Sequence, residues 1–361
     1  MLFTPGSHVR WWLLWAAIPY GIVTGLRARL YQWGWLAQRK LPVPVISVGN
    51  LTVGGTGKTP VVIRLAEWLL AEGRRVAILS RGYGRTSRSK RLIVSDGAQL
   101  LVGPHEAGDE PFLIATRCPT AIVAVGADRY ELGQWVLSRF PIDCILLDDG
   151  FQHLALHRDV NLLLIDATDL SGLGAILPAG RLRESITAAT RATMIVVTRA
   201  HVAEQVASVV QRLREVMDSM LEPVQVVFRP EIIVSVRSGE SRSLSWCGGK
   251  KAILCSGIGH STSFRAMAEG LRLRLLDEVQ YPDHHQYTKA DIDRLRSRAE
   301  ELTADLILMT EKDSGKVALF LTETDHDWWA VRLSAEVAVG EERLRQMILS
   351  KSMPVRVEAC A

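Results

Sequence analysis

The residues with the clearest chemistry lie in one stretch near the start of the chain, Val43–Pro60. Its first part, Val43–Val48, is short, apolar and β-branched, as in a buried strand, and a helical pattern begins at Val61. Between them, Thr52–Thr59 supplies three glycines, a lysine and a hydroxyl. A loop of this kind directs backbone N–H groups and the positive end of a helix at a polyphosphate. The stretch therefore predicts a nucleoside triphosphate site.

The loop follows the pattern G-x-x-x-x-G-K-[ST] except at its first position, where Thr52 replaces glycine. We expect Lys58 to reach the β- and γ-phosphates and the Thr59 hydroxyl to hold Mg²⁺. A glycine-rich turn that only caps a helix is the alternative, and the Gly-Lys-Thr order between a strand and a helix favours phosphate binding. The predicted nucleotide-binding residues are Thr52, Val53, Gly54, Gly55, Thr56, Gly57, Lys58 and Thr59.

Two pairs of carboxylates could work with this loop. Asp148 and Asp149 follow the apolar run Cys144–Leu147, and an Asp at the end of a strand beside a phosphate loop can hold Mg²⁺ directly or through water. An ordinary turn is the alternative for this pair. Asp109 and Glu110 stand at a predicted helix start, where capping would explain one acid but leaves the second without a role.

Basic and histidine residues add further candidates. Arg74–Arg91 contains seven basic residues and no acid, which indicates either a solvated loop or a surface for an anionic substrate. Leu177–Glu184 offers guanidinium groups that could neutralise charge in a phosphoryl transition state. His284 follows Asp283 without a third metal ligand at suitable spacing, so a proton-handling role is favoured. Thr310–Asp313 is similar to the guanine-reading element of GTPases, but its spacing is wrong.

The elements that must position these residues alternate between strand-like and helical patterns, which predicts an α/β fold with a mostly parallel sheet covered on both faces. The 361 residues are enough for two domains. We expect an N-terminal segment over 1–40, a phosphate-loop domain over 41–228, a linker over 229–245 and a smaller α/β domain over 246–361. Five cysteines without C-x-x-C spacing favour a reduced cytosolic setting over disulfides or a zinc site.

The N-terminal segment is unusually aromatic and basic. It holds five of the ten tryptophans, and no Asp or Glu occurs before Glu67. The uncharged run Trp11–Leu26 is 16 residues long and contains Pro19, whereas a spanning helix needs about 20 apolar residues. A cleaved secretory signal would leave a mature chain that starts near the phosphate loop. We therefore expect a helix in the bilayer interface, with a helix docked on the protein's own core as the alternative.

Taken together, these segments resemble the tetraacyldisaccharide 4′-kinase family, the lipid A 4′-kinases of Gram-negative bacteria. In that family the phosphate loop also begins with a residue other than glycine, so Thr52 supports the resemblance. Two departures, His260-Ser-Thr after Gly-Ile-Gly and Tyr281 in place of a usual Phe, lie beside the reacting groups. The matching segments are Gly49–Pro60, Ser80–Arg85, Gly108–Pro111, Asp148–His153, Pro178–Glu184, Pro282–His284 and Thr310–Asp313.

The resemblance implies transfer of the ATP γ-phosphate to the 4′-hydroxyl of a tetraacylated glucosamine disaccharide 1-phosphate. It implies ATP and Mg²⁺ as cofactors, with Lys58 on the phosphates and Mg²⁺ held by Thr59, Glu110 and Asp148. Asp109 would take the hydroxyl proton with help from His284. The remaining implied site residues, which would organise metal, water and substrate or complete the site, are Asp148, Asp149, Arg183 and Glu184.

The implied fold is a P-loop NTPase-type parallel-sheet domain with a second, smaller α/β domain and a membrane-associated N-terminal helix. The expected partners are the lipid A precursor and the cytoplasmic face of the bacterial inner membrane, with no nucleic acid; the sequence does not give the oligomeric state. Two other functions stay open. One is a membrane-recruited NTPase switch that needs a residue to position water rather than a base for an alcohol. The other is a binding module with a vestigial loop, which the intact Gly57-Lys58-Thr59 and Asp148 disfavour.

Overall fold

The computed structural model describes residues 9–217, 222–259, 261–325 and 327–352; His260, one of the two departures from the family pattern, lies outside them. The described residues form a 13-stranded sheet in the order β11-β10-β12-β13-β8-β7-β6-β1-β5-β2-β4-β3, with β9 on β8. Its strands are β1 Val45–Asn50, β2 Val76–Ser80, β3 Arg91–Asp96, β4 Ile122–Gly126, β5 Cys144–Asp148, β6 Val160–Asp166, β7 Met194–Thr198, β8 Val224–Ser235, β9 Ser241–Arg242, β10 Lys251–Ser256, β11 Arg274–Gln280, β12 Leu306–Thr310 and β13 Trp328–Val339.

Helices cover both faces of this sheet, as an α/β sequence pattern predicts. The α-helices are α1 Leu14–Gln32, α2 Lys58–Ala71, α3 Pro104–Ala107, α4 Asp109–Arg117, α5 Arg129–Leu137, α6 Ala203–Arg214, α7 Ser261–Gly270, α8 Lys289–Leu302, α9 Glu311–Val317 and α10 Glu341–Lys351. Short 3₁₀ turns, including η2 Leu170–Leu173 and η3 Ile186–Arg191, connect them.

Strands β7, β6, β1, β5, β2 and β4 pair in parallel, and β3 closes the edge as an antiparallel strand. Alternate residues of the central strands enter different cores. In β5, Leu146 packs with residues of α2, α4 and α10, whereas Leu147 packs on the opposite face with residues of α5. Because the strands are parallel, their carboxyl ends lie at one edge, which is where an open α/β sheet binds its ligand. The predicted mostly parallel α/β fold is confirmed.

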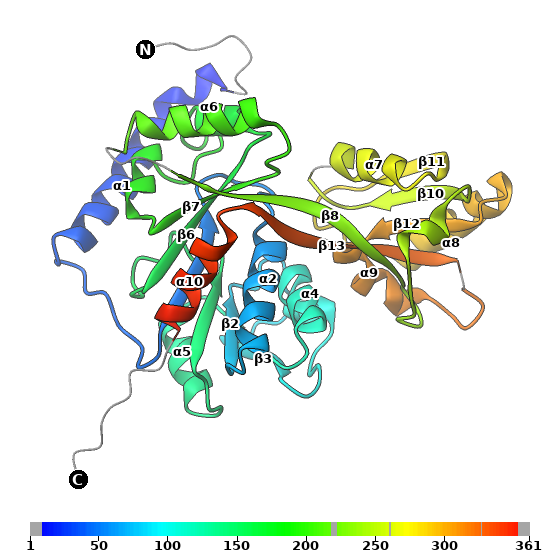
Figure 1. The fold of residues 1–361 in the computed structure, drawn as a ribbon, viewed down its shortest axis with the longest axis horizontal. Coiled ribbons are helices and arrows are strands. Elements are labelled where there is room, and N and C mark those ends of the chain that lie inside the picture. The colour runs from blue at the N-terminus through cyan, green and yellow to red at the C-terminus, as the bar shows by residue number, and fades with distance from the viewer. Residues whose placement is uncertain (1–8, 218–221, 260, 326, 353–361) are drawn as a thin grey trace.

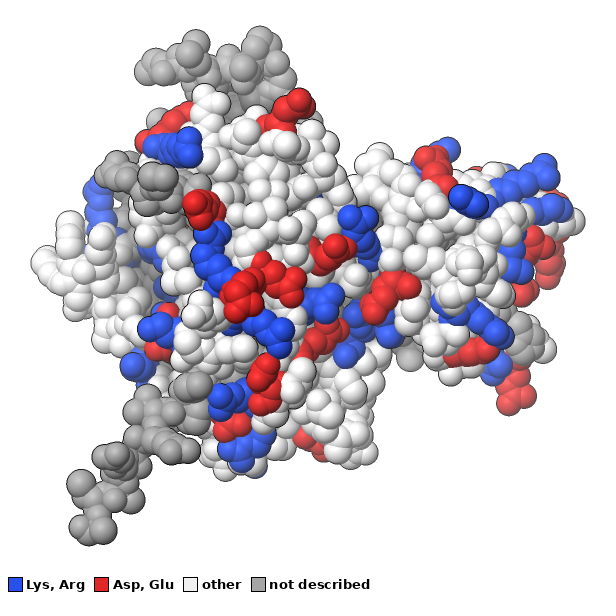
Figure 2. Space-filling model, viewed as in Figure 1, with Lys and Arg blue, Asp and Glu red and all other residues white. Residues whose placement is uncertain are grey.

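A two-stranded ribbon joins the two lobes seen in Figure 1. Strands β8 and β13 are 12 residues long and pair antiparallel over most of their length. We call the part with β1–β7 the N-terminal lobe, and the part with β10–β12 and α7–α9 the C-terminal lobe. On the face drawn in Figure 2, charged side chains of both signs gather where the lobes meet.

This ribbon crosses one of the expected boundaries. The segment 229–245, predicted as a linker, begins inside β8, which pairs with both β13 and β9. The end of the chain also differs from a simple C-terminal domain over 246–361. Leu344 and Ile348 of α10 are buried in the same cluster as α2, so the described C-terminal helix packs on the N-terminal lobe. The division of the chain into domains stays a prediction.

Candidate active site

The glycine-rich loop follows β1, as expected, and its backbone conformation requires glycine at two positions. Gly54 has φ +115° and Gly57 has φ +77°, both in the region that side-chain-bearing residues rarely adopt. A Cβ atom on Gly57 would lie 2.2 Å from the Phe228 ring of β8. The helix α2 begins immediately afterwards at Lys58. The loop and the positive end of α2 therefore lie together at the carboxyl edge of the sheet.

Lys58 is buried and lies between polar groups from two strand ends. Its Nζ donates to Asn50 Oδ1 at 3.2 Å and lies 3.6 Å from Asp149 Oδ1. Arg183 Nη1 donates to the other oxygen of Asp149 at 2.7 Å. Burial favours the neutral acid, but Lys58 and Arg183 outweigh it and hold the pKa of Asp149 below its usual range. Asp149 is therefore ionised and links the predicted phosphate lysine to Arg183.

Asp148 has the opposite electrostatic character. It is fully buried at the end of β5, and Ser80 Oγ donates to its Oδ2 at 2.9 Å. Burial, together with the nearby charges of Glu110 and Asp149, raises the pKa of Asp148 to about 7. Among the described residues, its Oδ1 atom has no hydrogen-bond partner. The site thus concentrates negative charge that the protein alone does not balance.

These features fit a magnesium ion that is bound together with a nucleotide. No group of three or more His, Cys, Asp or Glu side chains in the described ranges forms a metal cage by itself. Mg²⁺ at phosphate sites needs only one or two carboxylates, because phosphates and waters complete its shell. The unpartnered Asp148 oxygen, the Thr59 hydroxyl at the start of α2 and the half-buried Glu110 supply ligands of that kind. The predicted metal set is chemically suitable.

The Asp109–His284 pair joins residues from the two lobes. Asp109 opens α4, and His284, with φ +60°, lies in the loop after β11. His284 Nδ1 lies 3.2 Å from Asp109 Oδ2, although the two residues are 175 positions apart in sequence. Burial raises the pKa of Asp109, but the hydrogen bond to His284 and the charge of Lys316 outweigh it and lower the pKa. The structure therefore brings together the carboxylate and the histidine that the sequence assigned to proton transfer.

Lys316 contacts Asp109 of this pair and the residue next to His284, and it was not among the predicted residues. It is completely buried, and its Nζ donates to Asp109 Oδ2 and to the carbonyl of His285, each at 3.0 Å. Asp313 Oδ1 lies 3.3 Å from the same ammonium. A buried lysine needs such partners, since an isolated charge would be very costly in the interior. The only sequence signal was its position three residues after Asp313, in the helix that Thr310 caps.

Two further predicted groups, Glu184 and the basic stretch Arg74–Arg91, differ in how they relate to the residues described above. Glu184 is buried and accepts a hydrogen bond of 2.7 Å from Arg191, and no bond links it to Lys58 or Asp149 in the described part of the chain. In the basic stretch Arg74–Arg91, the exposed Tyr83 ring lies 5.5 Å from the His284 ring. That loop therefore borders the Asp109–His284 pair.

Several polar groups at strand ends were missed by the sequence reading. They are Asn50 at the end of β1, Ser80 at the end of β2, Asp166 at the end of β6, Thr198 at the end of β7 and Arg199 directly after it. All of them except Arg199 are buried. A polar residue that ends an apolar strand of a parallel sheet was the available signal, because all these ends meet at one edge.

Comparison with known proteins shows the family of this chain. A family model described as "LpxK: Tetraacyldisaccharide-1-P 4′-kinase" matches residues 9–353. The chain belongs to this family. A tetraacyldisaccharide 4′-kinase of an Anaeromyxobacter species is 38% identical over 322 residues, covering 89% of this chain and 86% of the relative. The enzyme of the same name from Geobacter sulfurreducens is 39% identical over 308 residues, covering 84% of each.

A solved structure in the same family has the same overall fold. It is the "apo" form of LpxK from Aquifex aeolicus in complex with ATP, which is 32% identical to this chain. The two align with a TM-score of 0.74, covering 94% of this chain and 98% of that one. The family expected from the sequence motifs is therefore confirmed, whereas the roles of individual site residues stay predictions.

The buried charge cluster predicts a large stability loss for Lys316→Met. The substitution leaves Asp109 and Asp313 facing each other without the ammonium, which we expect to cost about 3–5 kcal/mol. Urea unfolding at neutral pH measures the difference. Lys312→Met, on the same helix but with its ammonium partly exposed, is the matched control and should cost far less. Equal losses in the two variants would contradict a special role for the Lys316 charge.

The raised pKa of Asp148 predicts an unusual pH dependence of the free energy of unfolding. Its pKa is about 7 in the folded protein against an ordinary value of 3.8, so its contribution to stability is present below about pH 4 and is lost as the pH rises through 7. In chelator, without nucleotide, Asp148→Asn should therefore stabilise the protein at pH 8, by roughly 1–4 kcal/mol. The gain should shrink toward pH 5. Urea unfolding at both pH values tests this, and a variant less stable than the wild type at pH 8 would contradict it.

Proposed function

We propose that this protein transfers the γ-phosphate of ATP to the 4′-hydroxyl of a tetraacylated glucosamine disaccharide 1-phosphate, as its family membership indicates. The product would be the bis-phosphorylated lipid A precursor. The observation that carries the proposal is the Asp109–His284 pair, assembled from both lobes next to the phosphate loop. Glu110, which follows Asp109, is close enough to influence the pKa of both Asp148 and Lys312. The acceptor base and the metal carboxylates therefore share one site.

In the proposed reaction, the N–H groups of residues 52–59 and Lys58 hold the ATP phosphates. Mg²⁺, held by Thr59, Asp148 and Glu110, would neutralise phosphate charge when bound. Asp109 accepts the proton of the 4′-hydroxyl while the oxygen forms its bond to the γ-phosphorus. The bond from that phosphorus to the leaving ADP oxygen breaks. Phosphoryl transfer depends mainly on positioning and charge neutralisation, and this chain supplies both together with one base.

The chain's other residues orient these groups. His284 fixes Asp109 through Nδ1, and its Nε2 atom lies 3.4 Å from Lys312 Nζ. Lys312 Nζ also donates to Asp283 Oδ1 at 3.0 Å. Arg183 and Asp149 place positive and negative charge beside Lys58. Glu184 would act through the segment 177–184, which it anchors by its ion pair with Arg191.

The direct test supplies purified protein in detergent with ATP, Mg²⁺ and the disaccharide 1-phosphate lipid. Mass spectrometry should detect a lipid product that carries one more phosphate. ATP hydrolysis at the same rate with or without lipid, and no phosphorylated lipid, would instead support an NTPase switch. Absence of ATP binding altogether would support a binding module with a vestigial loop.

Replacement of Asp109 by Asn should lower kcat by about 10²–10⁴, the usual contribution of a positioned general base. ATP affinity should stay near that of the wild type, because Asp109 is not placed on the phosphate loop. Single-turnover phosphorylation of the lipid and calorimetric ATP titration measure the two effects. Asp293→Asn, an exposed carboxylate on α8, is the control. Wild-type turnover in Asp109→Asn would remove the base from the mechanism.

We also propose that α1 lies in the cytoplasmic surface of the bacterial inner membrane, as a peripheral or monotopic element. Among the described residues, eleven exposed large hydrophobic side chains lie between Trp11 and Leu36, against six in the rest. Trp12 and Trp15 are 70% and 73% exposed. No helix in the described ranges is long and apolar enough to cross a bilayer.

The position of α1 connects this surface to the site. The Tyr20 hydroxyl donates to the carbonyl of Arg183 at 3.0 Å, and Arg27 Nη1 donates to the carbonyl of Gln152 at 3.4 Å. Both carbonyls belong to segments that carry predicted site residues. A substrate whose acyl chains stay in the bilayer would therefore meet the site close to α1.

Introducing charge at the start of α1 and in the 3₁₀ turn Trp11–Leu13 before it should weaken membrane binding. We expect Trp12→Glu/Trp15→Glu to bind phosphatidylethanolamine–phosphatidylglycerol vesicles at least about tenfold less tightly, because two interfacial indoles are lost. Vesicle co-sedimentation measures this. Leu100→Glu/Leu101→Glu, which places the same charges on two exposed apolar residues elsewhere, is the control. Unchanged binding of the tryptophan variant would move the membrane contact to another surface, such as Arg74–Arg91.

A further inference from the structure

Four carbonyl groups of the glycine-rich loop accept hydrogen bonds from side chains outside the loop. Asn50 Nδ2 of β1 donates to the carbonyl of Thr52 at 2.9 Å, and the other three carbonyls accept from residues at or after the ends of β6 and β7. Arg181 donates to the carbonyl of Val53 through Nη2 at 2.7 Å and through Nε at 3.1 Å. Arg199 Nη1 donates to the carbonyl of Gly55 at 3.0 Å. The Thr198 hydroxyl donates to the carbonyl of Thr56 at 2.9 Å. The loop is thus bound along most of its length through its acceptor groups.

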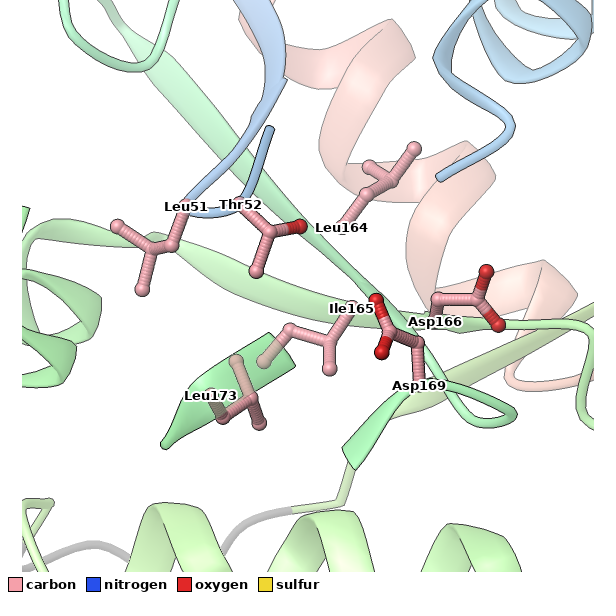
Figure 3. Close-up of a pocket in the computed structure, with 7 residues that line it drawn as sticks. All are labelled: Leu51, Thr52, Leu164, Ile165, Asp166, Asp169 and Leu173. Carbon is pink, nitrogen blue, oxygen red and sulfur yellow. The ribbon is translucent and has the colours of Figure 1, made fainter. Parts of the chain in front are cut away.

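Each arginine is in turn held by an aspartate. Arg199 pairs with Asp166, which is 5% exposed at the end of β6 and also accepts from Thr168. Arg181 Nη1 lies 2.6 Å from Asp169 Oδ2 in the turn that follows. Figure 3 shows Asp166 and Asp169 around a small recess behind the loop, together with Leu51, Thr52, Leu164, Ile165 and Leu173. Two aspartate–arginine–carbonyl chains therefore reach the loop from this side.

The chains approach from one side of β1 and leave the other side to the reacting groups. In the sheet, β6 and β7 lie on one side of β1, and β5 with Asp148 and Asp149 lies on the other. Among the described residues, the N–H groups of residues 54–57 donate to no protein acceptor. Since a peptide carbonyl and the next N–H point in opposite directions, binding the carbonyls on one side turns the N–H groups toward the other.

We propose that Arg181 and Arg199, each held by its aspartate, are positioning residues that orient the backbone N–H groups of the glycine-rich loop toward the phosphates of ATP. The proposal rests on the proposed function of that loop. The arginines act on the loop carbonyls and do not touch the nucleotide. Their removal relaxes the loop, so that ordering it again lowers the net affinity for ATP.

The test compares Arg199→Met and Asp166→Asn in the full-length protein by calorimetric titration with ATP and Mg²⁺. Each variant should bind ATP about tenfold more weakly, the loss expected for one charge-assisted hydrogen bond. In the lipid phosphorylation assay, KM for ATP should rise, while kcat at saturating ATP and KM for the lipid stay near wild type. Arg181→Met and Asp169→Asn should behave in the same way.

The aspartate variants separate this proposal from direct phosphate binding by the arginines. Removing the acid frees the guanidinium and leaves more positive charge near the phosphates, so a direct contact predicts tighter ATP binding in Asp166→Asn. Tighter or unchanged binding would overturn the positioning role. Arg212→Met, which breaks an exposed ion pair on α6, is the matched control. Melting temperatures measured in parallel identify variants that fail to fold; for these, Thr198→Val tests the contact with the Thr56 carbonyl alone.

The experiment distinguishes a failure of the positioning role from a failure of the proposed function. If the wild-type protein binds no ATP, the proposed function of the loop fails. If it binds ATP and phosphorylates the lipid while the four variants match it, only the positioning role fails.

Discussion

The antiparallel pairing of β8 with β13 is the constraint on which the rest of the site depends. This ribbon is continuous with both lobes, so the C-terminal lobe stands at a fixed edge of the parallel sheet. The loop after β11 then meets the start of α4, and His284 reaches Asp109. Phe228 of the same ribbon packs against Gly57. A single pair of strands therefore positions both His284, the partner of the proposed base, and the Phe228 ring that packs against the phosphate loop.

Charge compensation is the second organising principle. Asp109 is balanced by Lys316 and His284, and Asp149 by Lys58 and Arg183, so the pKa of each acid is lowered despite burial. For Asp148, burial and the charges of Glu110 and Asp149 outweigh the charge of Lys58, and its pKa is raised to about 7. Buried carboxylates of these two kinds suit different tasks, because a paired acid stays ionised whereas an unbalanced one favours a bound cation. The site thus contains two carboxylates that are ionised by their protein partners, Asp109 and Asp149, and one, Asp148, whose ionised form would be favoured by a bound cation.

The sequence predicted the elements whose pattern is local. Parallel strands buried on both faces read as apolar runs, so β1, β2 and β5 were expected, together with the loop before α2. It missed β11, a half-exposed edge strand with Asp277 and Glu278 in its middle, and it predicted short strand-like pieces and a linker where the long ribbon strand β8 lies. Lys316 and Arg199 were missed for another reason: their partners are distant in sequence, and only the packed fold brings them together.

The hydrogen bond from Tyr20 to the carbonyl of Arg183 has a geometric consequence. It ties α1 to Arg183, whose side chain pairs with Asp149. The depth of α1 in a membrane surface would therefore set the distance between that surface and the reacting groups. With α1 at a bilayer surface, enzyme and acceptor would search for each other by lateral diffusion in two dimensions. The lipid would need to raise only its sugar headgroup, while its acyl chains remain in the hydrocarbon.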